Sequence, residues 1–252
     1  MPRLGDEETV DKLQALKVYT QYRDLISTAP LEIIYSGSAD LERVKQALAA
    51  AFATLPREEV RVISTAAPHV CRESVQYVED VLDVTQGKLG MGFSCGSDDM
   101  PALLMGNTLF GGSSNSKLFL NVREKLSLCY YASSLYHRQK GLITVSSGIE
   151  FQNYQRAYDE IMAQLEAVQK GELEDWELEG ARSTLLNSYA TVGDSQGKLE
   201  NFYLGQAATG QHETPADLAR AIQDMTAERI CRAMSTVKLD TVYFLKGKEA
   251  EA

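Results

Sequence analysis

Apolar residues follow two periodicities along this chain, one typical of helices and one typical of strands. Spacings of three and four residues predict amphipathic helices, whereas alternation or a short apolar run predicts a strand. The predicted strands are residues 31–35, 74–81, 89–95, 128–136, 142–150 and 241–245. The predicted helices are residues 9–27, 41–54, about 100–110, 114–125, 153–170, 175–191, 195–209 and 215–236.

Several helix boundaries carry residues that favour helix ends. Pro30 ends the opening helix, and Asp40 is placed to cap the second one. Pro101 fits the first turn of the third helix, which the pair Gly111-Gly112 is expected to close. Gly171 follows the long helix over residues 153–170 as its C-terminal cap.

The order of the elements predicts an α+β fold. Residues 128–136 and 142–150 flank the turn at 137–141 and predict a β-hairpin. Strands pair through hairpins while helices come in blocks, which favours one mostly antiparallel sheet of about six strands with helices packed on it. The helices of residues 153–190 should cover one face, because their apolar stripe needs a partner surface. The stripe includes Tyr158, Ile161, Leu165 and Val168. We expect residues 1–252 to form a single α+β domain.

Composition and charge argue against two classes of partner. The chain has 252 residues, of which 44% are apolar and 24% charged, as in ordinary globular proteins. Its net charge is −10 and its pI about 4.9, and no basic cluster stands out, so we expect no nucleic-acid partner. No apolar run approaches the ~20 residues that span a bilayer, so we expect no membrane association.

The cysteines and histidines do not form a recognisable metal motif. They are Cys71, Cys95, Cys129 and Cys231 together with His69, His137 and His212. No cysteine pair has the Cys-x-x-Cys spacing, which favours reduced thiols in a cytoplasmic protein. The histidines are far apart and none has a Glu-His partner, so we expect no metal bound by this chain.

The most distinctive segment runs from residue 109 to residue 134. It reads as a glycine loop, a short helix and an aromatic strand, with Arg123 near the helix end and Tyr130 seven residues later at the strand start. Taken alone, an arginine at a helix C-terminus is explained by the helix macrodipole. Tyr130 alone is explained as a half-buried strand aromatic. Tyr131 competes with it, and strand alternation sends the two rings to opposite faces.

This layout resembles the C-terminal, non-zinc half of the pitrilysin/insulinase family of zinc peptidases. The resemblance begins with the opening helix and the element from Leu31 to Phe52, and it continues to the paired helices near residues 153–190. It departs at Gly37, which is followed by Ser38 where the family usually has aspartate. The inverted zinc motif of the family, His-x-x-Glu-His, occurs nowhere in the sequence. Within the family, the chain looks most like the non-catalytic subunits of bacterial two-chain members.

The resemblance implies the metallohydrolase-like α+β fold of the family and a role in peptide binding. In the family, the residues that match Arg123 and Tyr130 reach across a clamshell to the substrate held at the zinc of the other half. A guanidinium suits a peptide carbonyl, and a phenol suits an oxyanion. The resemblance therefore implies that this chain has no catalytic residue of its own and that zinc belongs to a catalytic partner half.

Two other interpretations stay open at the level of sequence. One is a structural or assembly subunit, like the core proteins of this family in respiratory complexes, which needs no peptide contact. The retained arginine and tyrosine argue weakly against it. The other is a peptidase whose zinc half lies outside this sequence, either in the same gene or in a separate subunit.

Overall fold

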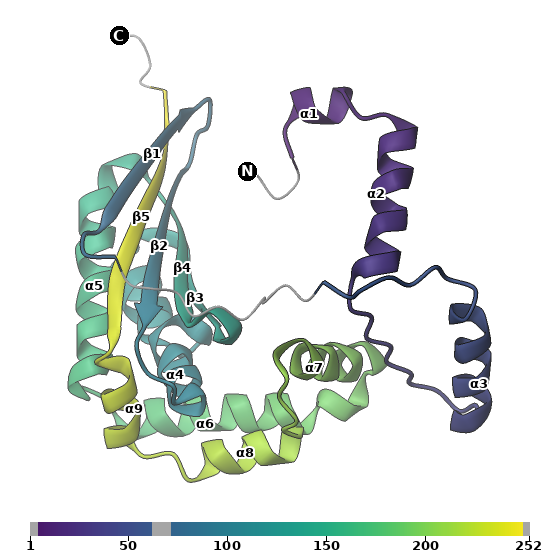
Figure 1. Cartoon of the computed structure of the whole chain (residues 1–252). Coiled ribbons are helices and arrows are strands. Elements are labelled where there is room, and N and C mark those ends of the chain that lie inside the picture. The colour runs from purple at the N-terminus through teal and green to yellow at the C-terminus, as the bar shows by residue number, and fades with distance from the viewer. Residues whose placement is uncertain (1–4, 62–71, 249–252) are drawn as a thin grey trace.

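Five strands form one sheet in the part of the chain that the computed structural model describes, residues 5–61 and 72–248. The strands are β1 (Gln76–Leu82), β2 (Gly87–Cys95), β3 (Cys129–His137), β4 (Leu142–Ile149) and β5 (Val237–Gly247). Their order across the sheet is β1-β5-β2-β4-β3 (Figure 1). β1 pairs in parallel with β5, and the other three pairs are antiparallel. The predicted α+β fold with a mostly antiparallel sheet is confirmed.

The predicted sixth strand does not form among the described residues. The apolar run 31–35 is a loop between α2 (Ala15–Thr28) and α3 (Leu41–Phe52). A strand needs a neighbouring strand to satisfy its backbone N–H and C=O groups, and in the described residues this run has none. The sheet therefore has five strands rather than about six.

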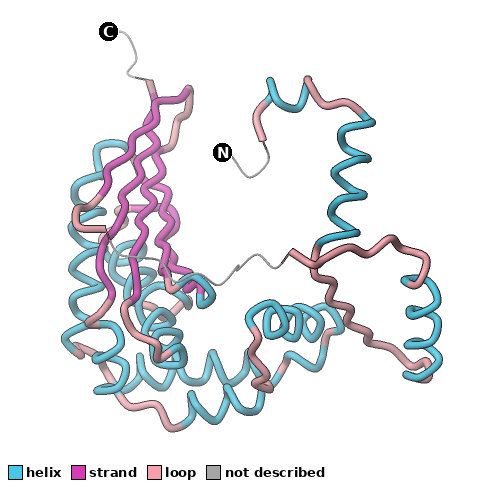
Figure 2. Tube along the Cα trace, viewed as in Figure 1, coloured by secondary structure: helices cyan, strands magenta, loops and turns pink. Residues whose placement is uncertain are grey.

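Helices cover one face of the sheet and extend below it (Figure 2). They are α4 (Met100–Asn107), α5 (Tyr154–Lys170), α6 (Asp175–Ala190), α7 (Gln196–Thr209), α8 (Pro215–Gln223) and α9 (Ala227–Met234). Along β2, the side chains of Leu89, Met91 and Phe93 are buried, while that of Lys88 is exposed. The core thus lies between the sheet and its helical layer.

The long helix α5 matches its predicted apolar stripe. Ile161, Leu165 and Val168 are buried in the main core, and Tyr158 packs against that core from a partly buried position. Gly171 ends the helix in the left-handed conformation, with a φ of 77°. The 3.6-residue period therefore located this helix and its buried face correctly.

Two predicted helices are each broken into two. The opening helix is divided into α1 (Glu7–Asp11) and α2, and the predicted helix over residues 215–236 is divided into α8 and α9. The second break has a clear local cause, since the Thr226 side chain accepts a hydrogen bond from the Arg229 amide and so starts a new helix. Apolar spacing continues across both breaks and does not reveal them.

Residues 5–61, which we call the N-terminal arm, stand apart from the sheet (Figure 1). Neither α1 nor α3 has a buried residue, and α2 buries only Ser27 and Thr28. All the residues of the main hydrophobic core belong to residues 72–248, which we call the C-terminal lobe.

Candidate functional site

A polar hollow of about 360 Å³ lies where a helix ends and β3 begins. Its polar and charged lining residues are Arg123, Glu124, Ser127, Tyr130, Glu150 and Asn153. The structure thus brings together the arginine and the tyrosine that the sequence singled out. We call this feature the Arg123–Tyr130 hollow.

Arg123 comes from the last turn of η2 (Leu118–Lys125), a π-helix. Its guanidinium carbon lies 4.6 Å from the ring centroid of Phe119, one turn earlier, which favours a cation–π contact. One guanidinium nitrogen lies 3.5 Å from a carboxylate oxygen of Glu124. The side chain is 39% exposed, so it keeps donors that face solvent.

The turn from η2 into β3 depends on an unusual backbone conformation. Ser127 has a φ of 50°, in the left-handed region that non-glycine residues rarely adopt. The Leu126 amide donates to the Asn121 carbonyl at 3.1 Å, and the Leu128 amide donates to the Val122 carbonyl at 3.0 Å. These bonds hold the tight turn that places the start of β3 beside the end of η2.

A β-bulge at Tyr130 changes the direction of the strand's side chains. Cys129 pairs with Ile149 and Tyr131 pairs with Gly148, so Tyr130 is an extra residue with no partner opposite. Strict alternation would bury one of the two tyrosines. Instead Cys129 and Ala132 face the core, and Tyr130 and Tyr131 are 59% and 38% exposed.

The two tyrosines nevertheless have different surroundings. Tyr131 packs on the open face of the sheet, where a Cβ added at Gly148 would lie 2.6 Å from its ring. Its hydroxyl lies 3.5 Å from the Ser146 hydroxyl. Tyr130 is the tyrosine that lines the hollow. The bulge therefore exposes both rings but leaves only Tyr130 beside Arg123.

Glu150 and Asn153, from the segment that follows β4, also line the hollow, and no motif in the sequence marks them as site residues. The hairpin register brings them close, because Cys129 pairs with Ile149 at the same end of the sheet. The proximity of residue 150 to the start of β3 therefore follows from the predicted hairpin. The side-chain amide of Gln152 donates a hydrogen bond to the Glu150 carboxylate at 2.9 Å.

Cys129 borders the hollow but is not set up as a nucleophile. Burial raises the pKa of its thiol to about 11, and the positive charge of Arg123 opposes this rise only in part. A thiol with this pKa is protonated at neutral pH and is a poor nucleophile. The groups of the hollow that remain available for hydrogen bonding include those of Arg123, Tyr130 and the carboxylates of Glu124 and Glu150.

The pair Gly111-Gly112 helps to position η2 by close packing and not as a helix cap. Gly111 lies within η1 (Thr108–Gly112), a π-helical turn that continues α4. A Cβ at Gly111 would lie 2.7 Å from the Leu118 side chain and 2.7 Å from the Ser134 hydroxyl. The expected C-cap does not form, because neither glycine has a positive φ. Glycine is needed here for close approach.

Two buried polar contacts fix the same region, and local sequence patterns do not reveal them. The Ser134 hydroxyl donates to the Asn107 side-chain oxygen at 2.7 Å. The Lys117 ammonium lies 3.0 Å from the Glu177 carboxylate, with both side chains about nine-tenths buried. Each contact joins residues far apart in sequence, so only the folded chain brings them together.

The side chains of the described residues do not form a set of ligands that would fit a zinc ion. Within residues 5–61 and 72–248, no group of three or more histidine, cysteine, aspartate or glutamate residues could hold a metal ion. A ring nitrogen of His137 lies 3.0 Å from the Thr144 hydroxyl, and His212 is exposed. His69 and Cys71 lie outside the described residues. Among the described helices, none is long and apolar enough to cross a membrane.

Comparison with known proteins identifies the fold and its relatives. Residues 12–185 match the model described as "Peptidase M16 inactive domain". The chain is 36% identical over 252 residues to the "Probable inactive metalloprotease YmfF" of Bacillus subtilis, covering 97% of this chain and 58% of that protein. It therefore spans little more than half the length of this curated relative.

Two solved structures share the arrangement. A conserved protein from Enterococcus faecalis is similar with a TM-score of 0.85 and 25% identity, over 100% of this chain and 60% of that one. A peptidase M16 inactive domain from Pseudomonas fluorescens has a TM-score of 0.76 and 16% identity, over 98% of this chain and 61% of that one. The second likeness is one of fold alone.

Proposed function

The chain belongs to the peptidase M16 family through the inactive domain of that family, and from this premise we propose that it is the peptide-binding half of a two-part zinc peptidase. The pitrilysin/insulinase resemblance seen in the sequence is confirmed by the family match. The proposal adds that Arg123 and Tyr130 contact a peptide and that the zinc-bearing half is a separate lobe or subunit.

One observation carries the proposal: Arg123 and Tyr130 line the same solvent-open hollow. Arg123 would otherwise be an ordinary surface arginine, and Tyr130 an ordinary strand aromatic. The Tyr130 ring is exposed because of the β-bulge, and regular strand alternation would not predict this exposure for both tyrosines. β-Bulges are frequent beside functional sites because they redirect a side chain.

The two side chains suit different parts of a bound peptide. The rigid fork of the Arg123 guanidinium can donate two hydrogen bonds to backbone carbonyls of an extended peptide. The Tyr130 hydroxyl can donate to a carbonyl oxygen as negative charge develops on it. Both groups would then contact a peptide that lies between this chain and the zinc-bearing half.

The hydrolytic chemistry itself is assigned to the partner half. A zinc ion there would polarise the scissile carbonyl and lower the pKa of a bound water. The described residues of this chain supply no ligand set for such an ion. What this chain contributes is orientation of the peptide and a hydrogen bond to the oxyanion.

The test is cleavage of a quenched fluorescent peptide of mixed sequence. The purified chain is assayed alone, and then mixed with a family member from the same organism that carries His-x-x-Glu-His. We expect hydrolysis only in the mixture. Stoichiometric zinc and robust hydrolysis by the chain alone would overturn the proposal. Unchanged partner activity, with no peptide binding by the chain, would favour the assembly-subunit interpretation.

A further inference from the structure

A second cavity lies near the end of β3, at the opposite end of the strand from Tyr130. It has an outer chamber of about 390 Å³ and a narrow inner slot of about 30 Å³. The two compartments share three lining residues, Met100, Tyr136 and Arg138. Within the described residues, this cavity and the Arg123–Tyr130 hollow have no lining residue in common. We call the outer chamber and the slot together the Arg138 cavity.

Apolar side chains from α4 and α8 form most of the wall of the inner slot. They are Met100, Pro101, Leu104, Leu218 and Ile222. The slot has room for about two water-sized groups, because one such group needs roughly 10–15 Å³ of this kind of space. A slot of this size and lining admits a short apolar group, such as an isopropyl group. It is too small for a long alkyl chain or an aromatic ring.

Two tyrosine hydroxyls are available as hydrogen-bond donors at this cavity. Tyr136 and Tyr189 both line the slot, and neither hydroxyl has a hydrogen-bond partner within residues 5–61 and 72–248. Burial raises the pKa of the Tyr136 phenol to about 12, and it also raises the pKa of Tyr189. Both hydroxyls are therefore protonated at neutral pH and can donate to an acceptor on a ligand.

Arg138 supplies a positive charge beside the two hydroxyls. Within the described residues, its hydrogen bonds all start from one nitrogen, Nη2, which donates to the side-chain oxygen of Gln211 and, at 3.4 Å, to the Glu213 carboxylate. A guanidinium has five N–H donors, so Nη1 and Nε keep donors for a ligand. The Arg138 side chain is 27% exposed, so a ligand can reach it. A carboxylate is the group that best fits a guanidinium edge, because it accepts two parallel hydrogen bonds.

Two carboxylates of the chain also line the cavity and limit the affinity for an anion. Asp98 lines the outer chamber but is exposed, so solvent and salt screen its charge. Glu213 lines the slot and contacts Arg138. A ligand carboxylate would therefore compete with Glu213 for the same guanidinium. Neutralising Glu213 should strengthen the binding of an anion and weaken the binding of a cation, which distinguishes the two kinds of ligand.

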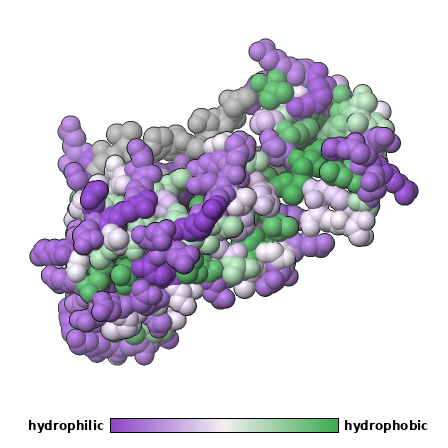
Figure 3. Space-filling view, turned by 90° about the horizontal axis from the view of Figure 1, so that it is seen from below, coloured by the Kyte–Doolittle hydropathy of each residue, from purple (hydrophilic) through white to green (hydrophobic). Residues whose placement is uncertain are grey.

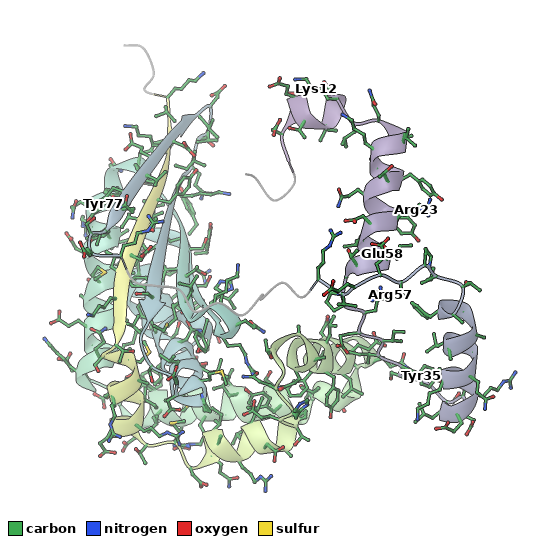
Figure 4. All side chains as sticks on the ribbon, viewed as in Figure 1. Lys12, Arg23, Tyr35, Arg57, Glu58 and Tyr77 are labelled. Atoms are coloured by element: carbon green, nitrogen blue, oxygen red, sulfur yellow. The ribbon has the colours of Figure 1, made fainter. Side chains whose placement is uncertain are left out.

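The cavity belongs to the C-terminal lobe alone. None of residues 5–61 lines it, and the labelled arm residues Arg23, Tyr35 and Arg57 lie apart from α4 and α8 in Figure 4. Figure 3 shows the molecule from below, where apolar residues of the lobe lie as patches among polar ones. A small recess of mixed polarity on such a surface is typical of a site for a small ligand group.

We propose that the Arg138 cavity binds a carboxylate that carries a short branched apolar group. The carboxylate accepts hydrogen bonds from Arg138 and from the hydroxyls of Tyr136 and Tyr189, and the apolar group enters the slot between α4 and α8. Two sources share this chemistry, a small aliphatic acid and the C-terminal residue of a peptide. The outer chamber would hold the preceding part of a peptide. The inference is independent of the proposed peptidase role, because the cavity and the Arg123–Tyr130 hollow are lined by different residues.

The test is an NMR chemical-shift titration of the full chain labelled with nitrogen-15. The probes are 3-methylbutanoate and N-acetylglycylvaline, and the matched controls are the uncharged amides of both. We expect at least one of the acids to bind with a Kd of about 1 mM or lower, as for an efficient ligand of this size. Its amide should bind about 10-fold more weakly or worse, because a hydrogen bond to a charged group is lost. Tighter binding of the peptide acid would identify a peptide end as the source, and equal or tighter binding of 3-methylbutanoate would identify a small acid.

Three variants assign the binding to the cavity. Arg138→Gln should weaken the acids by about 10-fold or more, and Tyr136→Phe by about 3-fold or more, since each removes donors to the carboxylate. Glu213→Gln should strengthen the acids by about 3-fold, because it removes a like charge that is partly exposed. The control is Tyr203→Phe, which removes the hydroxyl of an exposed tyrosine on α7 outside the cavity.

Circular dichroism should show that the variants keep the fold. Tyr136→Phe and Glu213→Gln change only polar tips, so the test does not depend on the folding of Arg138→Gln. Amides that bind as tightly as the acids, weaker acid binding by Glu213→Gln, or no shift with either acid at about 10 mM would each overturn the proposal. The peptide-cleavage test is unaffected by these outcomes, because it reports on the Arg123–Tyr130 hollow.

Discussion

Arg123 and Tyr130 are seven residues apart in sequence, one at the end of a π-helix and the other on a β-bulge, and they line the same polar hollow. Neither the helical nor the strand period requires this proximity. It comes from the left-handed turn at Ser127 and from the extra residue in β3. The hollow is therefore a product of two local irregularities.

Removing the Tyr130 hydroxyl should lower turnover of the reconstituted pair. In Tyr130→Phe, we expect kcat to fall on the order of 10²-fold if the phenol donates to the oxyanion. KM should change less, because the oxyanion does not exist in the ground state. The control is Tyr131→Phe, whose hydroxyl lies on the open sheet face near Ser146. Wild-type kcat in Tyr130→Phe, with unchanged stability, would reduce Tyr130 to a strand aromatic.

Replacing Arg123 by lysine should weaken peptide binding more than turnover. The ammonium keeps the charge but loses the planar fork that can donate two parallel hydrogen bonds. We expect KM to rise by about 10-fold, equivalent to one lost hydrogen bond to a charged group. Arg220→Lys on α8 is the control, because that arginine is exposed and pairs with Asp217. Equal KM values for both variants and the wild type would contradict the assigned role.

Periodicity was enough to predict most of the fold. Ile161, Leu165 and Val168 located α5 and its buried face, and the hairpin of β3 and β4 was read from two apolar runs and the turn between them. The error at residues 31–35 has a physical cause. The run has the composition of a strand, but strand formation depends on a neighbour that a local pattern does not contain.

The candidate site was predictable only in part. The spacing of Arg123 and Tyr130 gave the two residues, through the family resemblance, but not their surroundings. Glu150 and Asn153 follow from the hairpin register, whereas the bulge at Tyr130 does not. The buried pair of Lys117 and Glu177 joins residues sixty positions apart and leaves no local signal.

A β-branched residue at Ser127 should destabilise the lobe. The backbone there has a φ of 50°, and a branched side chain in the left-handed region clashes with the backbone. For Ser127→Val we expect a loss of about 1–2 kcal/mol in the free energy of unfolding, measured by urea denaturation. The control is Ser133→Val at an exposed position of β3, where valine favours the strand. Equal stability of the two variants would mean that the turn is not strained.

Adding a methyl group at Gly111 should cost stability by overpacking. The new Cβ would lie 2.7 Å from the Leu118 side chain and 2.8 Å from the Ser134 backbone nitrogen. We expect Gly111→Ala to lose about 1–3 kcal/mol in thermal or urea unfolding. Gly197→Ala is the matched control, because a Cβ there meets nothing within 4 Å and alanine favours the helix α7. A neutral Gly111→Ala would show that η1 can shift away from β3 without cost.

The ion pair of Asp99 and Arg229 should give the lobe an acid-sensitive contribution to stability. Asp99 caps α4, and Arg229 on α9 donates to its carboxylate at 2.6 and 3.0 Å. The hydrogen bond from Arg229 holds the pKa of Asp99 below its usual value. Because the folded-state pKa is the lower one, this stabilisation is present above pH ~4 and is lost as the pH falls through the folded-state pKa.

For Asp99→Asn, which keeps a capping side chain, we expect a loss of at most ~1 kcal/mol at pH 7, because both side chains of the pair are partly exposed and solvent screens the interaction. The difference from the wild type should shrink as the pH falls through the folded-state pKa of Asp99, since the wild-type carboxyl then becomes protonated. Unfolding free energies measured across this range check the prediction. Asp98→Asn is the control, since it leaves the contact with Arg229 in place. A difference between wild type and Asp99→Asn that does not change between neutral and acidic pH would show that the charge of Asp99 contributes nothing to stability.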